Sequence, residues 1–157
     1  MKNLILSLVI LCIGLFACQS TKPPEVVLNA FQEKFTGAEK ISWMQEEENE
    51  WEAEFMMGEK KMSACFDNSG SWFETETEVG VNELPSPVVD SINFKFMGYE
   101  IGEAAAIEKI NFTGFEILIV KEGGELEILI TAEGEISEIK EMKANNEEGD
   151  EEGEDDQ

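Results

Sequence analysis

Two stretches of the chain repeat apolar residues at the three- and four-residue spacing of an amphipathic helix. The first is PPEVVLNAFQEKFTG, residues 23–37, and the second is LPSPVVDSINFKFMG, residues 84–98. Each has proline near its start, which a first helical turn tolerates, and each ends at glycine, which is favoured just after a helix. The pattern therefore predicts two short helices, each with one apolar face.

The segments after each predicted helix alternate apolar and polar residues with the two-residue period of β-strands. In WEAEF, residues 51–55, three apolar residues alternate with two glutamates, which indicates a sheet buried on one face and solvated on the other. The strands predicted near 115–121 and 125–132 have apolar residues on both faces, which is typical of central or partly covered strands. The same pattern would result if these strands exposed an apolar patch to a partner. The predicted strands are 41–45, 50–57, 60–67, 72–79, 107–111, 115–121, 125–132 and 136–142.

The two halves of this pattern are predicted to be copies of one unit. A shift of 61 residues places Phe35 on Phe96, and a shift of 64 residues places Gly70 on Gly134, a difference that one loop insertion explains. We therefore predict an α+β fold, in which a tandem helix-plus-antiparallel-strands repeat packs its helices on a mainly antiparallel sheet. The domain would span 24–143, with repeats at 24–80 and 84–143.

The stretch FDNSGSWFETETE, residues 66–78, combines a turn with a run of carboxylates. Its counterpart in the second half, ITAEGEI, keeps the glycine and loses the Asp and Asn, which favours a hairpin turn. A calcium site is the alternative, because Asp67, Asn68, Glu74 and Glu76 offer oxygen ligands. The distal glutamate of an EF-hand loop is missing, and a solvated acidic strand edge would account for the same residues.

The first residues, MKNLILSLVILCIGLFACQS, have the anatomy of a secretory signal, with one lysine and an apolar run too short to span a bilayer comfortably. The letters LFAC that end at Cys18 resemble the lipobox of bacterial lipoproteins. The resemblance implies a signal peptide at 1–17, a lipidated Cys18 and a tether at 18–23; an ordinary cleaved signal or an uncleaved anchor is the alternative. Only Cys65 would remain as a free side-chain thiol, so no intrachain disulfide is expected.

The chain is strongly acidic, with 35 Asp and Glu against 11 Lys and Arg and a formal net charge of -24. Nucleic acid would repel it, so no nucleic-acid partner is expected. Histidine is absent, which excludes imidazole bases and His-activated nucleophiles. We therefore do not expect this protein to be an enzyme. A hydrolase that uses two carboxyl groups would need a pocket in which their pKa values differ. Residues 144–157 are predicted to form a disordered acidic tail.

The order of these motifs resembles that of the PepSY-like family, which is also described as similar to β-lactamase inhibitory protein. The matching text is VVLNAFQEKF, Trp43, WEAEF, ACFDNSGSWFETETEV, LPSPVVDSI and GYEI, roughly residues 26–136. The resemblance implies a non-catalytic role, because PepSY domains are associated with holding peptidases inactive and the inhibitory protein binds an enzyme with a concave sheet face. The chain departs from the family at Thr36-Gly37, where relatives often show proline, and in its acidic tail.

We therefore expect an envelope lipoprotein that faces the periplasm or cell surface and binds a protein or peptide through an exposed sheet face. The candidate contacts are Trp43, Trp51, Trp72 and Phe73, because large aromatic residues anchor interfaces. Packing in the core would account for the same residues. The alternative function is calcium binding by the acidic strand and hairpin turn, and no other cofactor is expected.

Overall fold

The computed structural model describes residues 22–122 and 124–142. In this part of the chain the elements are α1 (Glu25–Lys34), β1 (Glu39–Glu47), β2 (Glu50–Met57), β3 (Lys60–Asp67), β4 (Trp72–Glu78), the 3₁₀ helix η1 (Val81–Glu83), α2 (Ser86–Lys95), β5 (Glu100–Lys109), β6 (Phe112–Lys121), β7 (Gly124–Ile130) and β8 (Ile136–Met142). The predicted signal peptide, the lipidation site Cys18 and the acidic tail lie outside the described residues. No helix within them is long and apolar enough to cross a membrane.

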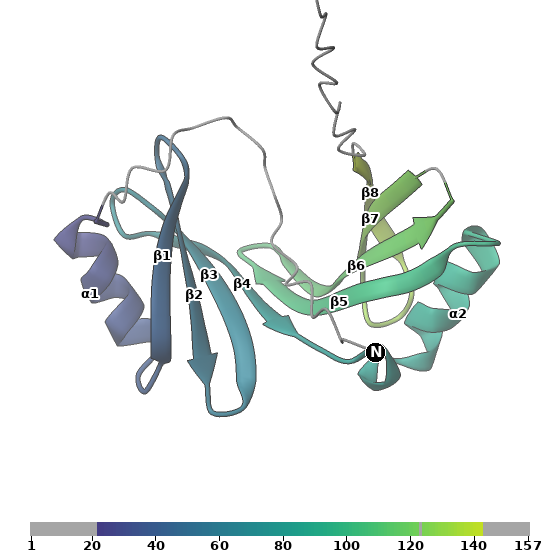
Figure 1. Ribbon diagram of the computed structural model, residues 1–157, viewed down its shortest axis with the longest axis horizontal. Helices are drawn as coiled ribbons and strands as arrows, with labels where there is room; N and C mark the ends of the chain where they lie inside the picture. Colours follow the sequence, from purple (N-terminus) through teal and green to yellow (C-terminus); the bar gives the residue numbers. More distant parts are fainter. Residues whose placement is uncertain (1–21, 123, 143–157) are drawn as a thin grey trace, which may run out of the picture.

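The described strands form one antiparallel sheet, in which each strand pairs with the next along the chain (Figure 1). Helix α1 precedes β1–β4, and helix α2 precedes β5–β8. The predicted combination of helices with an antiparallel sheet is therefore confirmed. That the two halves are repeats of one unit stays a prediction.

Both helices cover the same face of the sheet. Met62, Thr77, Ala106 and Phe115 are successive cross-strand partners from β3 to β6, and directly paired residues share a face. Met62 packs against the core under α1, and Phe115 packs against the core under α2. The sheet bends between its halves, with the helices on the outer side of the bend (Figure 1). The other face, called here the helix-free face, lies on the inner side.

Each helix buries its apolar stripe in a separate core. Under α1, the ring of Phe31 lies 5.0 Å from that of Phe55 and 5.2 Å from that of Trp43, measured between centroids. Under α2, Val88 and Ile92 are buried against a set of isoleucines that are also fully buried: Ile117, Ile119, Ile128 and Ile130. Burial of each such side chain stabilises the fold by about 1.5–3 kcal/mol, so the helices are held by their packing against the sheet.

The position of the fifth strand differs from the prediction, because β5 spans Glu100–Lys109 and not 107–111. Its centre is Ala104, Ala105 and Ala106, and alanine has a weak intrinsic preference for strands. In the fold Ala104 pairs with Ile117 of β6 and packs in the core under α2. Tertiary contacts therefore override the local preference.

The turn between β3 and β4 is a hairpin, as predicted. Gly70 has a φ of +83°, and its N–H donates to the carbonyl of Asp67 at 2.9 Å. The Oδ1 atom of Asp67 accepts from the backbone and hydroxyl of Ser69 and from the N–H of Ser71. Gly134 has a φ of +86° in the turn between β7 and β8. Glycine adopts this left-handed region at little steric cost, which explains its place in both turns.

Candidate functional site

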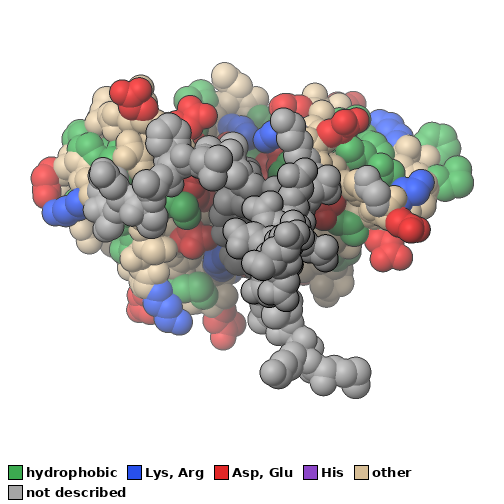
Figure 2. All heavy atoms as spheres, turned by 45° about the horizontal axis from the view of Figure 1, so that its top comes forward, with side chains coloured by type: hydrophobic (Ala, Val, Ile, Leu, Met, Phe, Trp, Pro, Cys, Tyr) green, Lys and Arg blue, Asp and Glu red, His purple; other side chains and the backbone are tan. Residues whose placement is uncertain are grey.

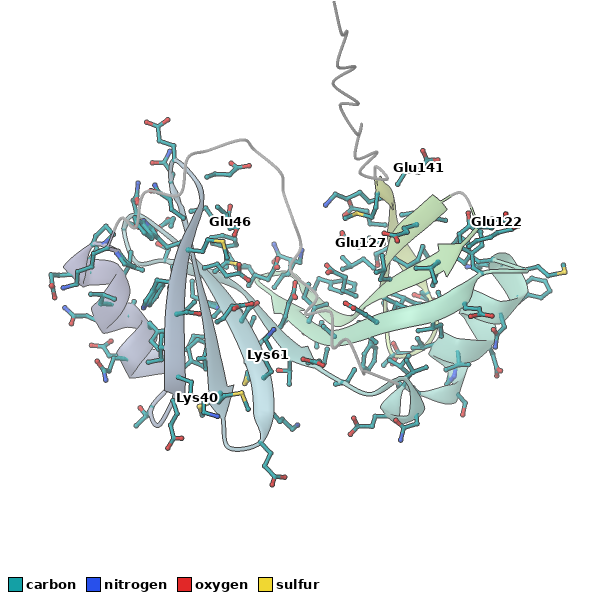
Figure 3. All side chains as sticks on the ribbon, in the orientation of Figure 1. Lys40, Glu46, Lys61, Glu122, Glu127 and Glu141 are labelled. Carbon is teal, nitrogen blue, oxygen red and sulfur yellow. The ribbon has the colours of Figure 1, made fainter. Side chains whose placement is uncertain are left out.

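The helix-free face carries rows of carboxylates that cross several strands. Glu52 of β2 pairs with Cys65, Cys65 pairs with Glu74, and Glu74 pairs with Lys109 of β5. The neighbouring row runs from Glu54 through Ser63, Glu76 and Ile107, and the next row joins Glu78, Ala105, Glu116, Leu129 and Glu138. Figure 3 labels Glu46 and Glu127, which point toward the space between the two halves of the sheet. Acidic side chains are also visible over both halves in Figure 2.

Three acidic side chains of this region each have one buried oxygen without a hydrogen bond among the described residues. Glu116 is only 3% exposed. Oε1 of Glu76, Oε2 of Glu103 and Oε1 of Glu116 are buried and have no hydrogen-bond partner among the described residues. Glu74 differs, because its Oε2 lies 2.7 Å from Nζ of Lys109. The face therefore holds more buried negative groups than cations to balance them.

Burial raises the pKa of several carboxyl groups on this face, and the rise is large for Glu52, Glu76 and Glu116. It raises the pKa of Glu52 to about 7 and that of Glu116 to about 7, where repulsion from Glu127 and Glu74 adds to the effect. It raises the pKa of Glu76 to about 9, with further increases from the charges of Glu116 and Glu74. Glu76 therefore holds a proton at neutral pH, since its neighbours and its burial both disfavour the ionised form.

The run of acids along β4 was expected to be a solvated edge, and this expectation is wrong. Glu74 and Glu76 lie on one face, but one is held in an ion pair and the other is largely buried. The bend of the sheet places them against residues of β2, β5 and β6. Cys65 lies in the same row, where burial raises the pKa of its thiol far above the usual value.

An open hollow of about 340 Å³ lies where the start of β3, the end of β4 and the first half of β5 meet η1, and is called here the acidic hollow. Its carboxylates come from β2, β4 and β5, and its rim includes η1. The lining residues are Glu52, Glu54, Lys61, Met62, Ser63, Glu76, Glu78, Val79, Gly80, Val81, Gly102, Glu103 and Ala104. A carboxyl group with a raised pKa can give up a proton, and an ionised carboxylate can bind a cation. The second use fits better, because the unpartnered oxygens gather on an open surface.

The predicted aromatic contacts lie mainly on the helix-bearing face. Trp51 is 4% exposed in the core under α1, and its Nε1 donates to Oδ1 of Asn68 at 2.6 Å. Trp43 and Trp72 pack against the same core, and Nζ of Lys34 lies 3.8 Å from the ring centroid of Trp72. Assigning these three tryptophans to an exposed sheet face was therefore wrong, because α1 and its core hold them on the other side.

The fourth aromatic residue, Phe73, is partly buried. It follows Trp72 at a register shift between β3 and β4, where Phe66 pairs with Trp72 and Cys65 pairs with Glu74. Contact between Phe73 and a partner stays a prediction.

The four predicted calcium ligands are not gathered into one site. Asp67 accepts hydrogen bonds within its own turn, and Asn68 bonds Trp51 and Asn49. Glu74 is paired with Lys109. Among residues 22–122 and 124–142, no group of three or more acidic or thiol side chains is placed to hold a metal ion. The turn residues therefore serve the hairpin, and Glu76 belongs to the acidic hollow.

The sequence pattern did not reveal Glu103 and Glu116 as members of the site. Glu116 is the single acid in FTGFEILIV, and an isolated carboxylate inside an apolar strand was a signal that could have found it. Glu103 gave no comparable signal, because it belongs to the strand that the pattern misplaced.

The chain has a BLIP-like fold, although no known protein family and no curated protein matches it with significance. A BLIP-like protein from Bacteroides fragilis has a TM-score of 0.69 and 19% identity over 81% of this chain and 92% of that one. A DUF2874 family protein from Bacteroides uniformis has a TM-score of 0.69 and 18% identity over 76% and 90%. A protein provisionally assigned to the periplasm of Bacteroides eggerthii has a TM-score of 0.68 and 19% identity over 77% and 90%. Likeness at these identities shows the fold alone.

Proposed function

We propose that this protein is a non-catalytic binding module of the bacterial envelope, whose helix-free face docks a protein partner. The observation that carries the proposal is the composition of that face. Half-buried Leu118 and Leu129 pair with Glu103 and Glu116, each of which has one buried oxygen without a hydrogen bond among the described residues, in strands that are hydrogen-bonded into one sheet. Apolar residues framed by polar ones are the usual anatomy of a protein interface.

The fold supports this use of the face. Both α-helices pack on the outer side of the bent sheet, which leaves the inner side uncovered by either of them. A curved antiparallel sheet presents side chains from many strands at fixed positions, so a partner can dock with little ordering cost. The BLIP-like name of one solved neighbour fits a role in holding an enzyme. We propose that the partner is a peptidase or another secreted enzyme that the protein inhibits or regulates.

The proposed location is the envelope, with the protein anchored through lipid on Cys18 and facing the periplasm or cell surface. It is supported by the LFAC lipobox and by the provisional periplasmic assignment of one neighbour. Growth with radiolabelled palmitate is expected to label the wild-type chain and to leave Cys18→Ala unlabelled. Equal labelling of the two would refute lipidation at this residue.

The docking proposal is tested by affinity capture from an envelope extract of the source bacterium, with the full-length chain as bait. The test variant is Leu118→Lys, on the helix-free face. The matched control is Phe94→Lys, which makes the same kind of change on a residue of α2 that is 84% exposed. A partner captured by wild type is expected to bind the control and to be lost with Leu118→Lys. Equal capture by both variants would show that the helix-free face is not the docking surface.

A further inference from the structure

The acidic hollow combines excess negative charge with an apolar wall. Five glutamates line it, namely Glu52, Glu54, Glu76, Glu78 and Glu103, and Lys61 is the one cation among its described lining residues. Nζ of Lys61, labelled in Figure 3, lies 3.6 Å from Oε1 of Glu54. Val81 of η1 is 40% exposed and supplies apolar surface beside the carboxylates, whereas Met62 and Val79 line the hollow from the cores under the helices. The lining therefore suits a ligand that has a positive end and an aliphatic stem.

Two carboxylates of the lining each have one buried oxygen without a hydrogen bond. Oε1 of Glu76 and Oε2 of Glu103 are buried in the lining without a hydrogen-bond partner among the described residues. Glu116, outside the lining, is 3% exposed, has one oxygen without a hydrogen bond among the described residues, and repels Glu76. Buried polar groups in native proteins normally have partners, so exceptions of this kind need an explanation. A donor bound in the hollow would supply hydrogen bonds to the oxygens of Glu76 and Glu103.

The shape of the hollow decides which cation fits. A metal ion needs several oxygens that converge on one point, and no described group of acids is placed to provide them. The volume of about 340 Å³ lies at the small end of the range for ligand pockets, about 300–1,000 Å³. Arginine carries five N–H donors in a planar fork, and lysine carries three donors on a flexible stem, so either reaches carboxylates that stand apart.

We propose that the acidic hollow receives one arginine or lysine side chain projected by the protein partner. This inference rests on the proposed docking function and adds to it the charged group of the partner that the face would recognise. The cationic head binds between Glu76 and Glu103 and displaces the proton that Glu76 holds when the hollow is empty. Its aliphatic stem packs on Val81 at the rim. The strong excess of acid in the chain favours a basic partner surface around this side chain.

The test is a titration of the isotope-labelled full-length protein with Nα-acetyl-arginine amide, followed by amide chemical shifts. Nα-acetyl-citrulline amide is the matched probe, since it has nearly the same shape and no charge. Saturable shifts are expected at Gly102 and Glu76 with a dissociation constant of about 1 mM, as befits so small a ligand. Citrulline amide is expected to bind at least about tenfold more weakly, because it lacks the charge-assisted hydrogen bonds.

The matched variants are Glu76→Gln/Glu103→Gln in the hollow and Glu59→Gln/Glu122→Gln in exposed turns, and each pair replaces two glutamates that could ionise by glutamines that cannot. The first pair is expected to weaken arginine amide at least about tenfold, and the second pair is expected to leave it unchanged. Equal binding of citrulline amide, or equal effects of the two variant pairs, would overturn the inference. Thermal unfolding of each variant verifies that it folds.

Capture of the partner separates this inference from the docking function. If Glu76→Gln/Glu103→Gln loses the partner as Leu118→Lys does, the cationic contact is supported. If Leu118→Lys loses the partner and the double glutamine variant keeps it, docking stands and the cationic side chain is refuted. If Leu118→Lys keeps the partner, the docking proposal itself fails, whatever the hollow binds.

Discussion

Replacing Glu76 by glutamine is expected to stabilise the protein at neutral pH. Glutamine keeps the shape of the side chain and mimics the protonated acid, which is the form that the folded state prefers. Glu76 is surrounded by Glu52 from β2, Glu74 from its own strand and Glu116 from β6, each of which raises its pKa. Across the β4–β5 pair, Lys109 is engaged by Glu74.

The size of the effect follows from the pKa in the two states. The pKa of Glu76 is about 9 in the folded chain, against 4.5 for an ordinary glutamate. Between those values the folded state binds a proton that the unfolded state releases, so stability falls as pH rises, by about 1.4 kcal/mol per pH unit. At pH 7 this amounts to about 3 kcal/mol, and below pH 4.5 it vanishes because both states are protonated. Glutamine removes the dependence, with an expected gain of about 1–3 kcal/mol at pH 7, since its buried amide also lacks partners.

The assay is equilibrium urea unfolding of wild type and Glu76→Gln at pH 4, 5.5, 7 and 8.5. The stability of the variant should exceed that of wild type by a margin that grows with pH. Glu78→Gln is the matched control, because Glu78 is exposed two residues further along the same strand, and its stability should follow wild type. A variant that is less stable than wild type at pH 7, or a margin that does not change with pH, would refute the burial of an unbalanced carboxyl group here.

Three further outcomes are expected. Gly134→Ala should destabilise the fold by about 2 kcal/mol more than Gly58→Ala, since both glycines have positive φ but a Cβ at 134 would lie 2.5 Å from the carbonyl oxygen of Pro87; equal unfolding midpoints would contradict this. The peptide that contains Cys65 should resist iodoacetamide in the folded protein and react in urea, as mass spectrometry can measure, because the thiol is buried among carboxylates. The affinity for arginine amide should rise from pH 6 to pH 9, because the cation requires ionised carboxylates. If binding releases one proton, the dissociation constant should fall by up to about tenfold per pH unit. Binding that does not depend on pH would contradict this.

Much of the fold could be predicted from local pattern. The apolar stripes that include Phe31 and Ile92 set both helices and the face that each buries, because a period of 3.6 residues leaves one side of a helix apolar. The hairpin at Gly70 followed from the need for a positive φ in a tight turn. These features depend on residues close together in sequence. The local pattern misplaced β5, whose centre is alanine, because its strand conformation comes from pairing with β6.

The candidate site could be predicted only in part. That Glu74 and Glu76 share one face follows from the two-residue period of a strand, which the sequence displays. That Glu76 is buried beside Glu116 does not, because 40 residues separate the two and only the register of β4, β5 and β6 brings them together. The sequence also offered the tryptophans as binding residues, since a pattern cannot say which face of a strand the helix will cover.

The sequence by itself determined the helices, most strands, the hairpins and the large negative charge, because each depends on local periodicity or on simple composition. The tertiary structure alone decided which glutamates are buried. Burial and pKa depend on every group that surrounds a side chain, and at Glu76 those groups come from β2, β4 and β6 across the bend of the sheet. The burial and the pKa of each glutamate were therefore determined by neighbouring groups that the sequence alone does not identify.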